Sequence, residues 1–191
     1  MLKTVRRLVL VILGLGLASS AARAAETYTL DLAHSSITFM IQHLGISFVH
    51  GRFNEVAGSF TIDKEAPAKS SFEMTIKADS IDTNIKKRDD HLRSAEFFDT
   101  KKFPDMTFKS TKVETIDGGY KVTGDFTMHG VTKAISFDLK GGKTVEFPKG
   151  TQRTGFATAL ILRRADFGIN ALPDGIANDV NIFIGFEGTK K

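Results

Sequence analysis

The feature that most limits the fold of this chain is a strict alternation of apolar and polar residues along many short segments. In SFEMTIK, residues 71–77, Phe72, Met74 and Ile76 occupy every second position and polar side chains stand between them. A period of two is typical of a β-strand with one buried face. The same period recurs in further segments, at residues 35–43, 59–63, 106–113, 120–127, 133–139, 154–162 and 179–187.

Short turns separate several of these segments. Asp117-Gly118-Gly119 and His129-Gly130 each join two alternating runs, as tight turns of antiparallel hairpins do. No helical segments alternate with the strands, which argues against a parallel α/β sheet. Roughly eight strands with short connections predict an all-β domain that closes as a barrel or packs as a sandwich.

One polar run interrupts the strand pattern. In KKRDDHLRSAEFF, residues 86–98, the side chains favour a short helix over Lys86–Ser94. On such a helix Asp89 and Arg93 stand four residues apart, and Arg88 and His91 stand three apart. We expect both pairs to form and the helix to brace or gate one end of a barrel.

The same run is the best candidate for a catalytic or metal site, but it is incomplete. His91 has no second histidine nearby in the sequence and no adjacent nucleophile, and the chain contains no cysteine. A metal site formed by His43, His50 and His91 stays an alternative. We expect no enzyme activity, no metal and no cofactor; the rival interpretation is a lipid-modifying or metal-dependent enzyme that uses His91 and its neighbours.

The first 24 residues are typical of an export signal. Lys3, Arg6 and Arg7 precede the ten apolar residues 8–17, and Ala22-Arg23-Ala24 resembles a cleavage site. Ten apolar residues are too few for a membrane-spanning helix, which needs about 20. We therefore expect a signal peptide over residues 1–24 and one mature domain over residues 25–191 without a transmembrane segment.

The charge balance excludes one class of partner. The chain has 26 Lys and Arg against 22 Asp and Glu, and four of the bases lie in residues 1–24, which leaves 22 against 22. A nucleic-acid-binding domain keeps a basic excess for phosphate contacts. We expect no nucleic-acid partner.

Phenylalanine dominates the aromatic residues, with 16 Phe, two Tyr and no Trp. Many of these rings fall on the apolar phase of the predicted strands. They either fill a core or line an open barrel, because an eight-stranded barrel has room for packed side chains or one small ligand. The candidate lining residues are Phe39, Ile41, Phe60, Met74, Phe108, Phe126, Phe137 and Phe156.

Four segments together resemble the YceI-like family of bacterial periplasmic proteins. They are AHSSITFMIQHLGISFVHGRF (33–53), SIDTNIKKRDDHLRSAEFFDTKKFPDMTFKST (80–111), GDFTMHGVTKAISF (124–137) and RRADFGI (163–169). The resemblance covers essentially the whole expected mature chain. Phe126 departs from the family, which commonly has Leu at that position.

The resemblance implies an eight-stranded, antiparallel, lipocalin-like barrel. It also implies a periplasmic binding or carrier protein that sequesters a long-chain polyisoprenoid or similar amphiphile, often as a homodimer. His43, Arg88 and His91 are then candidates for contacts with the ligand's head group at the barrel mouth. A further alternative is a module that docks on a membrane redox or transport partner, with the lipid only structural.

Overall fold

The computed structural model describes residues 25–190, so the leader expected at residues 1–24 lies outside the described residues. This part of the chain is almost entirely β-structure, with one α-helix, α1 (Lys86–Arg93), and short 3-10 turns η1 (Pro67–Lys69), η2 (Ala78–Ser80) and η3 (Arg164–Phe167). The strands are β1 (Glu26–His43), β2 (Ser47–Phe53), β3 (Val56–Ile62), β4 (Ser71–Lys77), β5 (Ile81–Asp82), β6 (Asp105–Ile116), β7 (Gly119–Met128), β8 (Val131–Glu146), β9 (Gln152–Arg163) and β10 (Ile176–Lys190).

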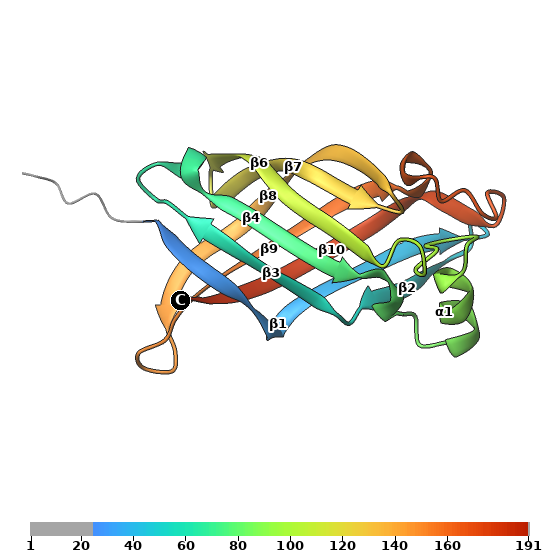
Figure 1. Ribbon diagram of the computed structural model, residues 1–191, viewed down its shortest axis with the longest axis horizontal. Coiled ribbons are helices and arrows are strands. Elements are labelled where there is room, and N and C mark those ends of the chain that lie inside the picture. Colours follow the sequence, from blue (N-terminus) through green and yellow to red (C-terminus); the bar gives the residue numbers. More distant parts are fainter. Residues whose placement is uncertain (1–24, 191) are drawn as a thin grey trace, which may run out of the picture.

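Eight of the strands close into an antiparallel barrel (Figure 1). They neighbour one another in the order β1, β3, β4, β6, β7, β8, β9, β10, and β10 pairs back onto β1. The long β1 has two partners along its other edge, since its first residues pair with β3 and its last residues pair with β2. β5 adds to the free edge of β2. The expected all-β, eight-stranded, lipocalin-like barrel is confirmed.

The alternating segments lie within strands, except that the segment 59–63 runs one residue past the end of β3, because each segment has an apolar face to bury. β4 has the bounds predicted from SFEMTIK, and its Phe72 is the register partner of Phe60 on β3. Other strands extend beyond their alternating segment. β1 begins at Glu26, although alternation predicted a strand only from Ser35.

Alternation did not predict β2 or the two-residue strand β5, and β2 is the longer of the two. Its sequence, SFVHGRF, contains Gly51, which interrupts the pattern. The close packing of Phe39 on β1 explains this glycine, because a Cβ at position 51 would lie 2.3 Å from the Phe39 ring. Gly51 therefore breaks the alternation of β2 and also makes room for the ring of Phe39, which lines the cavity.

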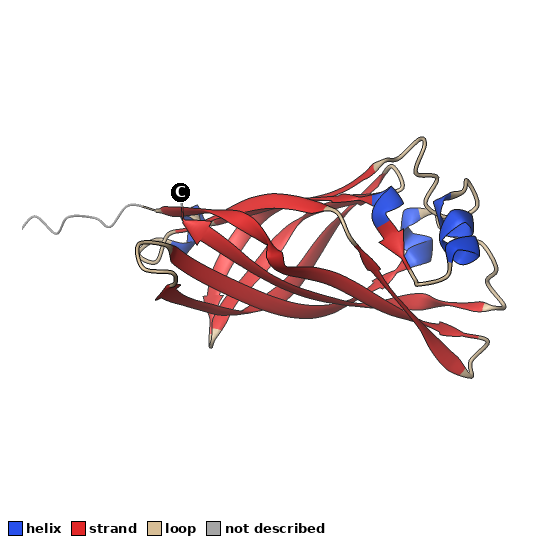
Figure 2. Cartoon of the chain, turned by 90° about the horizontal axis from the view of Figure 1, so that it is seen from below, coloured by secondary structure: helices blue, strands red, loops and turns tan. Residues whose placement is uncertain are grey.

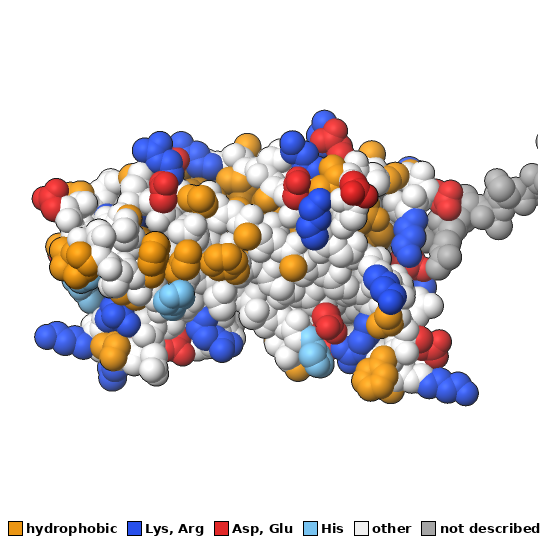
Figure 3. Space-filling model, turned by 180° about the vertical axis from the view of Figure 1, so that it is seen from behind, with side chains coloured by type: hydrophobic (Ala, Val, Ile, Leu, Met, Phe, Trp, Pro, Cys, Tyr) orange, Lys and Arg blue, Asp and Glu red, His pale blue; other side chains and the backbone are white. Residues whose placement is uncertain are grey.

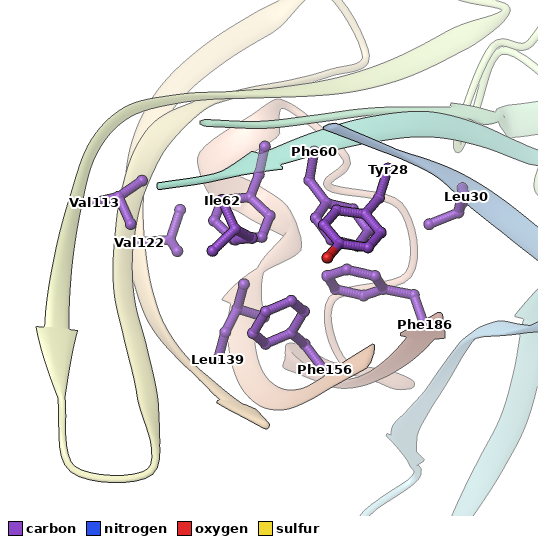
Figure 4. Close-up of a cluster of buried hydrophobic side chains, with 10 residues drawn as sticks. Tyr28, Leu30, Phe60, Ile62, Val113, Val122, Leu139, Phe156 and Phe186 are labelled. Carbon is purple, nitrogen blue, oxygen red and sulfur yellow. The ribbon is translucent and has the colours of Figure 1, made fainter. Parts of the chain in front are cut away.

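Packed side chains fill the barrel end that carries the two described termini. Tyr28 stacks on Phe60 with ring centroids 5.1 Å apart, and Phe156 and Phe186 meet Phe60 edge-on at 5.7 and 5.4 Å (Figure 4). All four rings are buried. We call this the aromatic end.

The opposite end carries the helix α1, as Figure 2 shows. The expected helix over Lys86–Ser94 is present as Lys86–Arg93, but neither expected side-chain pair forms within it. Asp89 instead accepts hydrogen bonds from the backbone N–H and the hydroxyl of Thr83, at 2.9 and 2.5 Å. Arg93 donates to the carbonyls of Asp79 and Ile81, at 2.7 and 2.8 Å. Asp89 and Arg93 thus bind the helix to the segment before it. Within the helix, Asp90 pairs with Lys86 at 2.6 Å and with Arg93 at 3.3 Å.

Candidate ligand-binding cavity

A cavity of about 420 Å³ occupies the barrel interior. Phe60 and Phe72 border it toward the aromatic end, and His43, His91 and Leu172 border it at the α1 end. These last three side chains are exposed, so the cavity opens to solvent at the α1 end. We call this opening the mouth.

The wall of the cavity is predominantly apolar. Of the 39 residues that line it, 30 are apolar, and the nine polar ones are Gln42, His43, Ser59, Glu73, Thr83, Arg88, His91, Thr158 and Arg164. A pocket of this size and composition suits an apolar ligand with a few polar contacts at one end. The wall therefore offers a large apolar surface against which a ligand can be buried.

The strands bring most of the predicted lining residues together on this wall. Phe39, Ile41, Phe60, Met74, Phe108, Phe126 and Phe137 all line the cavity. Phe156 lies elsewhere: it is buried within the aromatic end, where it contacts Phe60, Phe72 and Phe186. Alternation identifies the inward face of a strand, but it does not distinguish a filled end of the barrel from an open one.

The three predicted head-group residues all border the cavity. Arg88 donates from Nε to the Thr83 hydroxyl at 2.7 Å and from Nη2 to the Thr83 carbonyl at 2.8 Å. Within residues 25–190 it forms no ion pair with a carboxylate, so its charge is available to a ligand. His91 packs edge-on against Phe97, with ring centroids 4.9 Å apart, and its Nε2 contacts the Glu96 carboxylate.

The structure does not assemble a metal centre from the candidate histidines. Within the described residues, the group of side chains close enough to share a metal ion is Asp31, His34 and Glu187, and none of these borders the cavity. His34 Nδ1 lies 2.9 Å from the Asp31 carboxylate, and Arg153 contacts the same oxygen. Two hydrogen bonds lower the pKa of Asp31 from 3.8 to about 2. The bond with His34 has the larger effect, and the bond with Arg153 the next largest. The cluster is an ion-paired contact between strands.

Arg164 is a site residue that the sequence reasoning missed. It is 7% exposed and donates to the backbone carbonyls of Ala177, Ile169, Ala171 and Ile176 at 2.7 to 3.0 Å. Desolvation on burial lowers the pKa of its guanidinium group. By binding both ends of the loop between η3 and β10, Arg164 fixes the position of Leu172 at the mouth. Its signal in the sequence is the second of the two adjacent arginines that follow the alternating residues 154–162, within RRADFGI.

Comparison with known proteins agrees with this geometry. The sequence profile of the family described as YceI-like domain matches residues 28–187. A UPF0312 protein of Enterobacter sp. (strain 638) is 37% identical over 188 residues, which cover 97% of this chain and 98% of the relative.

Two solved structures share the fold. The Campylobacter jejuni YCEI protein is 33% identical and superposes with a TM-score of 0.68, covering 78% of this chain and 90% of that one. A polyisoprenoid-binding domain from Saccharophagus degradans has a TM-score of 0.63 at 19% identity, covering 86% and 98% of the two chains.

Fold and cavity together define a closed lipocalin-like barrel with an apolar interior that opens at one end. None of the helices within residues 25–190 is long and apolar enough to cross a membrane. With the family profile matched along almost all of the described residues, the chain belongs to the YceI-like family.

Proposed function

We propose that this protein is a periplasmic carrier that holds a long-chain polyisoprenoid, or a similar amphiphile, in its barrel. The observation that carries the proposal is the cavity wall, in which 30 of 39 residues are apolar. An isoprenoid tail has no polar groups to satisfy, so this wall can take it up without burying an unpaired polar group of the ligand. The polyisoprenoid-binding domain from Saccharophagus degradans, which has the same fold, supports this choice of ligand.

The size of the hydrophobic effect makes such binding strong enough. Burying about 20 methylene equivalents at roughly 0.8 kcal/mol each contributes about 16 kcal/mol before costs. Association and ordering of the chain cost about 4–15 kcal/mol. Net affinity therefore depends mainly on how much of the tail the cavity encloses, and polar contacts at the mouth adjust selectivity.

Those polar contacts come from Arg88, His43 and His91, which border the mouth on α1 and at the end of β1. The export signal expected at residues 1–24 supports a periplasmic location for the carrier. Arg88, which lacks a carboxylate partner within residues 25–190, favours an oxygen-rich head group over an aliphatic chain end.

The rival function is an enzyme built on His91, and its geometry is weaker. Glu96 and Phe97 occupy the surroundings of the His91 ring, and the described part of the chain places no metal-binding group of residues around it. A His91→Ala protein that folds and still carries its lipid supports the carrier. Loss of a stoichiometric metal ion in that variant would support the enzyme. The third alternative is a module that docks on a membrane protein and holds its lipid only as a structural part. It would be supported if a membrane protein co-purified with this chain and the bound lipid did not exchange.

The test of the carrier uses two neighbouring residues on β1. Ile41 lines the cavity, whereas Met40 does not, because successive side chains of a strand point to opposite faces. Ile41→Trp fills part of the cavity near the mouth and is expected to weaken binding of geranylgeraniol at least about tenfold, the loss from excluding two or more methylenes. Met40→Trp is the matched control and should bind like wild type.

Intrinsic affinity for the prenyl alcohol is measured by titration calorimetry on delipidated protein. Circular dichroism establishes that both variants keep the barrel. Equal affinity in wild type and a folded Ile41→Trp variant, or no binding by wild type, would overturn the proposed function.

A further inference from the structure

Three exposed aliphatic side chains surround one side of the mouth. Leu44 and Ile46 lie at the turn between β1 and β2, and Leu172 lies in the loop before β10. They are 58%, 80% and 55% exposed. We call these three residues the rim.

The rim is one bonded unit rather than three separate loop tips. The N–H of Leu44 donates to the carbonyl of Gly175 at 2.8 Å, which ties the β1–β2 turn to the loop before β10. The N–H of Ile176 donates to the carbonyl of Leu172 at 3.0 Å and closes that loop. Hydrogen bonds therefore hold the three side chains at the same end of the barrel.

The backbone of the rim is poorly suited to leucine. Leu44 and Leu172 have φ angles of 52° and 50°, in the left-handed region that favours Gly and Asn. A branched apolar side chain at such a position is uncommon, and here its exposed surface contributes little to the packing of the barrel. An apolar contact outside the barrel gives these two leucines a role.

Positive charge accompanies the rim at the α1 end. Lys86 and Lys87 on α1 and Lys101 and Lys102 in the loop after it are all exposed. Asp90 pairs with Lys86 at 2.6 Å, and the other three lysines form no ion pair with a carboxylate within the described residues. Figure 3 shows hydrophobic side chains at this end, on the left of the view, with Lys or Arg side chains projecting beside them. Exposed aliphatic residues and lysines at the same end of the barrel match the interface of a bilayer that contains anionic phospholipids.

The apolar surface also continues into the cavity. Leu172 belongs both to the rim and to the cavity wall. A lipid tail that moves from a bilayer into the cavity past Leu172 therefore stays against apolar atoms, and each methylene avoids the unfavourable transfer into water.

We propose that the rim inserts into the interface of a phospholipid bilayer, with the lysines of the α1 end on anionic phosphates, and that the barrel exchanges its lipid there. This docking rests on the carrier function proposed above, but the docking and the carrier function are tested separately. The partner is the lipid surface itself.

The test is flotation with vesicles of phosphatidylethanolamine and phosphatidylglycerol. The variant is Leu44→Asn with Ile46→Asn, which removes two rim side chains and places a residue that tolerates positive φ at position 44. The control is Leu32→Asn with Ile161→Asn, since both residues are 60% exposed but lie outside the rim. We expect the rim variant to lose at least about tenfold in membrane partitioning and the control to match wild type.

Three results would overturn the docking. They are a wild type that does not float, equal loss in both double variants, and a rim variant whose only defect is dissociation of a dimer seen by sedimentation. Loading of geranylgeraniol from detergent micelles separates the two proposals. A protein that loads from micelles but does not bind vesicles contradicts the docking alone, and one that binds vesicles but never loads contradicts the carrier alone.

Discussion

Asp31 shows how one carboxylate holds together distant parts of the chain. It lies on β1, and its Oδ2 contacts both His34, three residues on, and Arg153 on β9. Arg153 also lies 3.6 Å from the carboxylate of Glu187 on β10. These contacts stabilise the ionised form of Asp31, which is why its pKa falls to about 2. The carboxylate thus joins three neighbouring strands where β1 changes partners.

Stability should therefore depend on pH through Asp31. Because its folded-state pKa lies below the ordinary 3.8, its contribution is present above about pH 4 and is lost as pH falls toward pH 2. Asp31→Asn is expected to lower the free energy of unfolding by about 1 kcal/mol near neutral pH, since solvent partly screens the pairs. Near pH 2 the variant and wild type should unfold alike.

Urea unfolding over that pH range measures the difference between the two proteins. Asp125→Asn is the control, because Asp125 is exposed and has no ion pair within the described residues. A destabilisation by Asp31→Asn that persists unchanged at pH 2 would contradict this role of the carboxylate.

Among the elements, the helix α1 is held to the segment before it by two of its charged side chains. It has no side-chain hydrogen bond from its N-cap residue, Ile85. Asp89 is 7% exposed and fixes the helix to Thr83, and Arg93 fixes it to Asp79 in η2 and Ile81 in β5. Because Leu92 and His91 on this helix border the cavity, these hydrogen bonds set the shape of the mouth.

Two adjacent aspartates on α1 should differ sharply in their effect on stability. Asp89→Ala leaves the buried N–H and hydroxyl of Thr83 without their acceptor and is expected to cost about 2–3 kcal/mol. Asp90→Ala removes only the exposed pairs with Lys86 and Arg93 and should change little. The midpoint of urea unfolding measures both variants. Equal midpoints would mean that Asp89 does not anchor the helix.

At the scale of the whole molecule, the sequence alone was enough to predict the barrel and most of the residues that line its cavity. Strand alternation in residues such as Phe72, Met74 and Ile76 reports which face is buried, so eight strands and seven lining residues could be predicted. β2 could not be predicted, because Gly51, which makes room for the Phe39 ring, has no side chain and so interrupts the apolar–polar alternation. The three-dimensional partners of Asp89 and Arg164 were not predictable, since they are mostly backbone groups that any residue supplies.

The sequence likewise could not predict which end of the barrel is open. Phe60 and Phe156 have the same phase and the same chemistry, yet one borders the cavity and the other lies wholly within the aromatic end. The difference arises from contacts among four strands, where Tyr28, Phe60, Phe156 and Phe186 meet and leave no space. Only the closed barrel shows that the cavity opens at the α1 end.

The most direct measurement of the central claim is native mass spectrometry of the protein purified without harsh detergent. A cavity that binds an isoprenoid tail predicts a protein carrying one lipid per barrel, with the mass of a prenyl chain or related amphiphile. The lipid should be released when the protein is unfolded, and it should bind again when the protein is refolded in the presence of that lipid. A protein that emerges empty, and that takes up no prenyl or fatty amphiphile when these are supplied, would contradict the carrier.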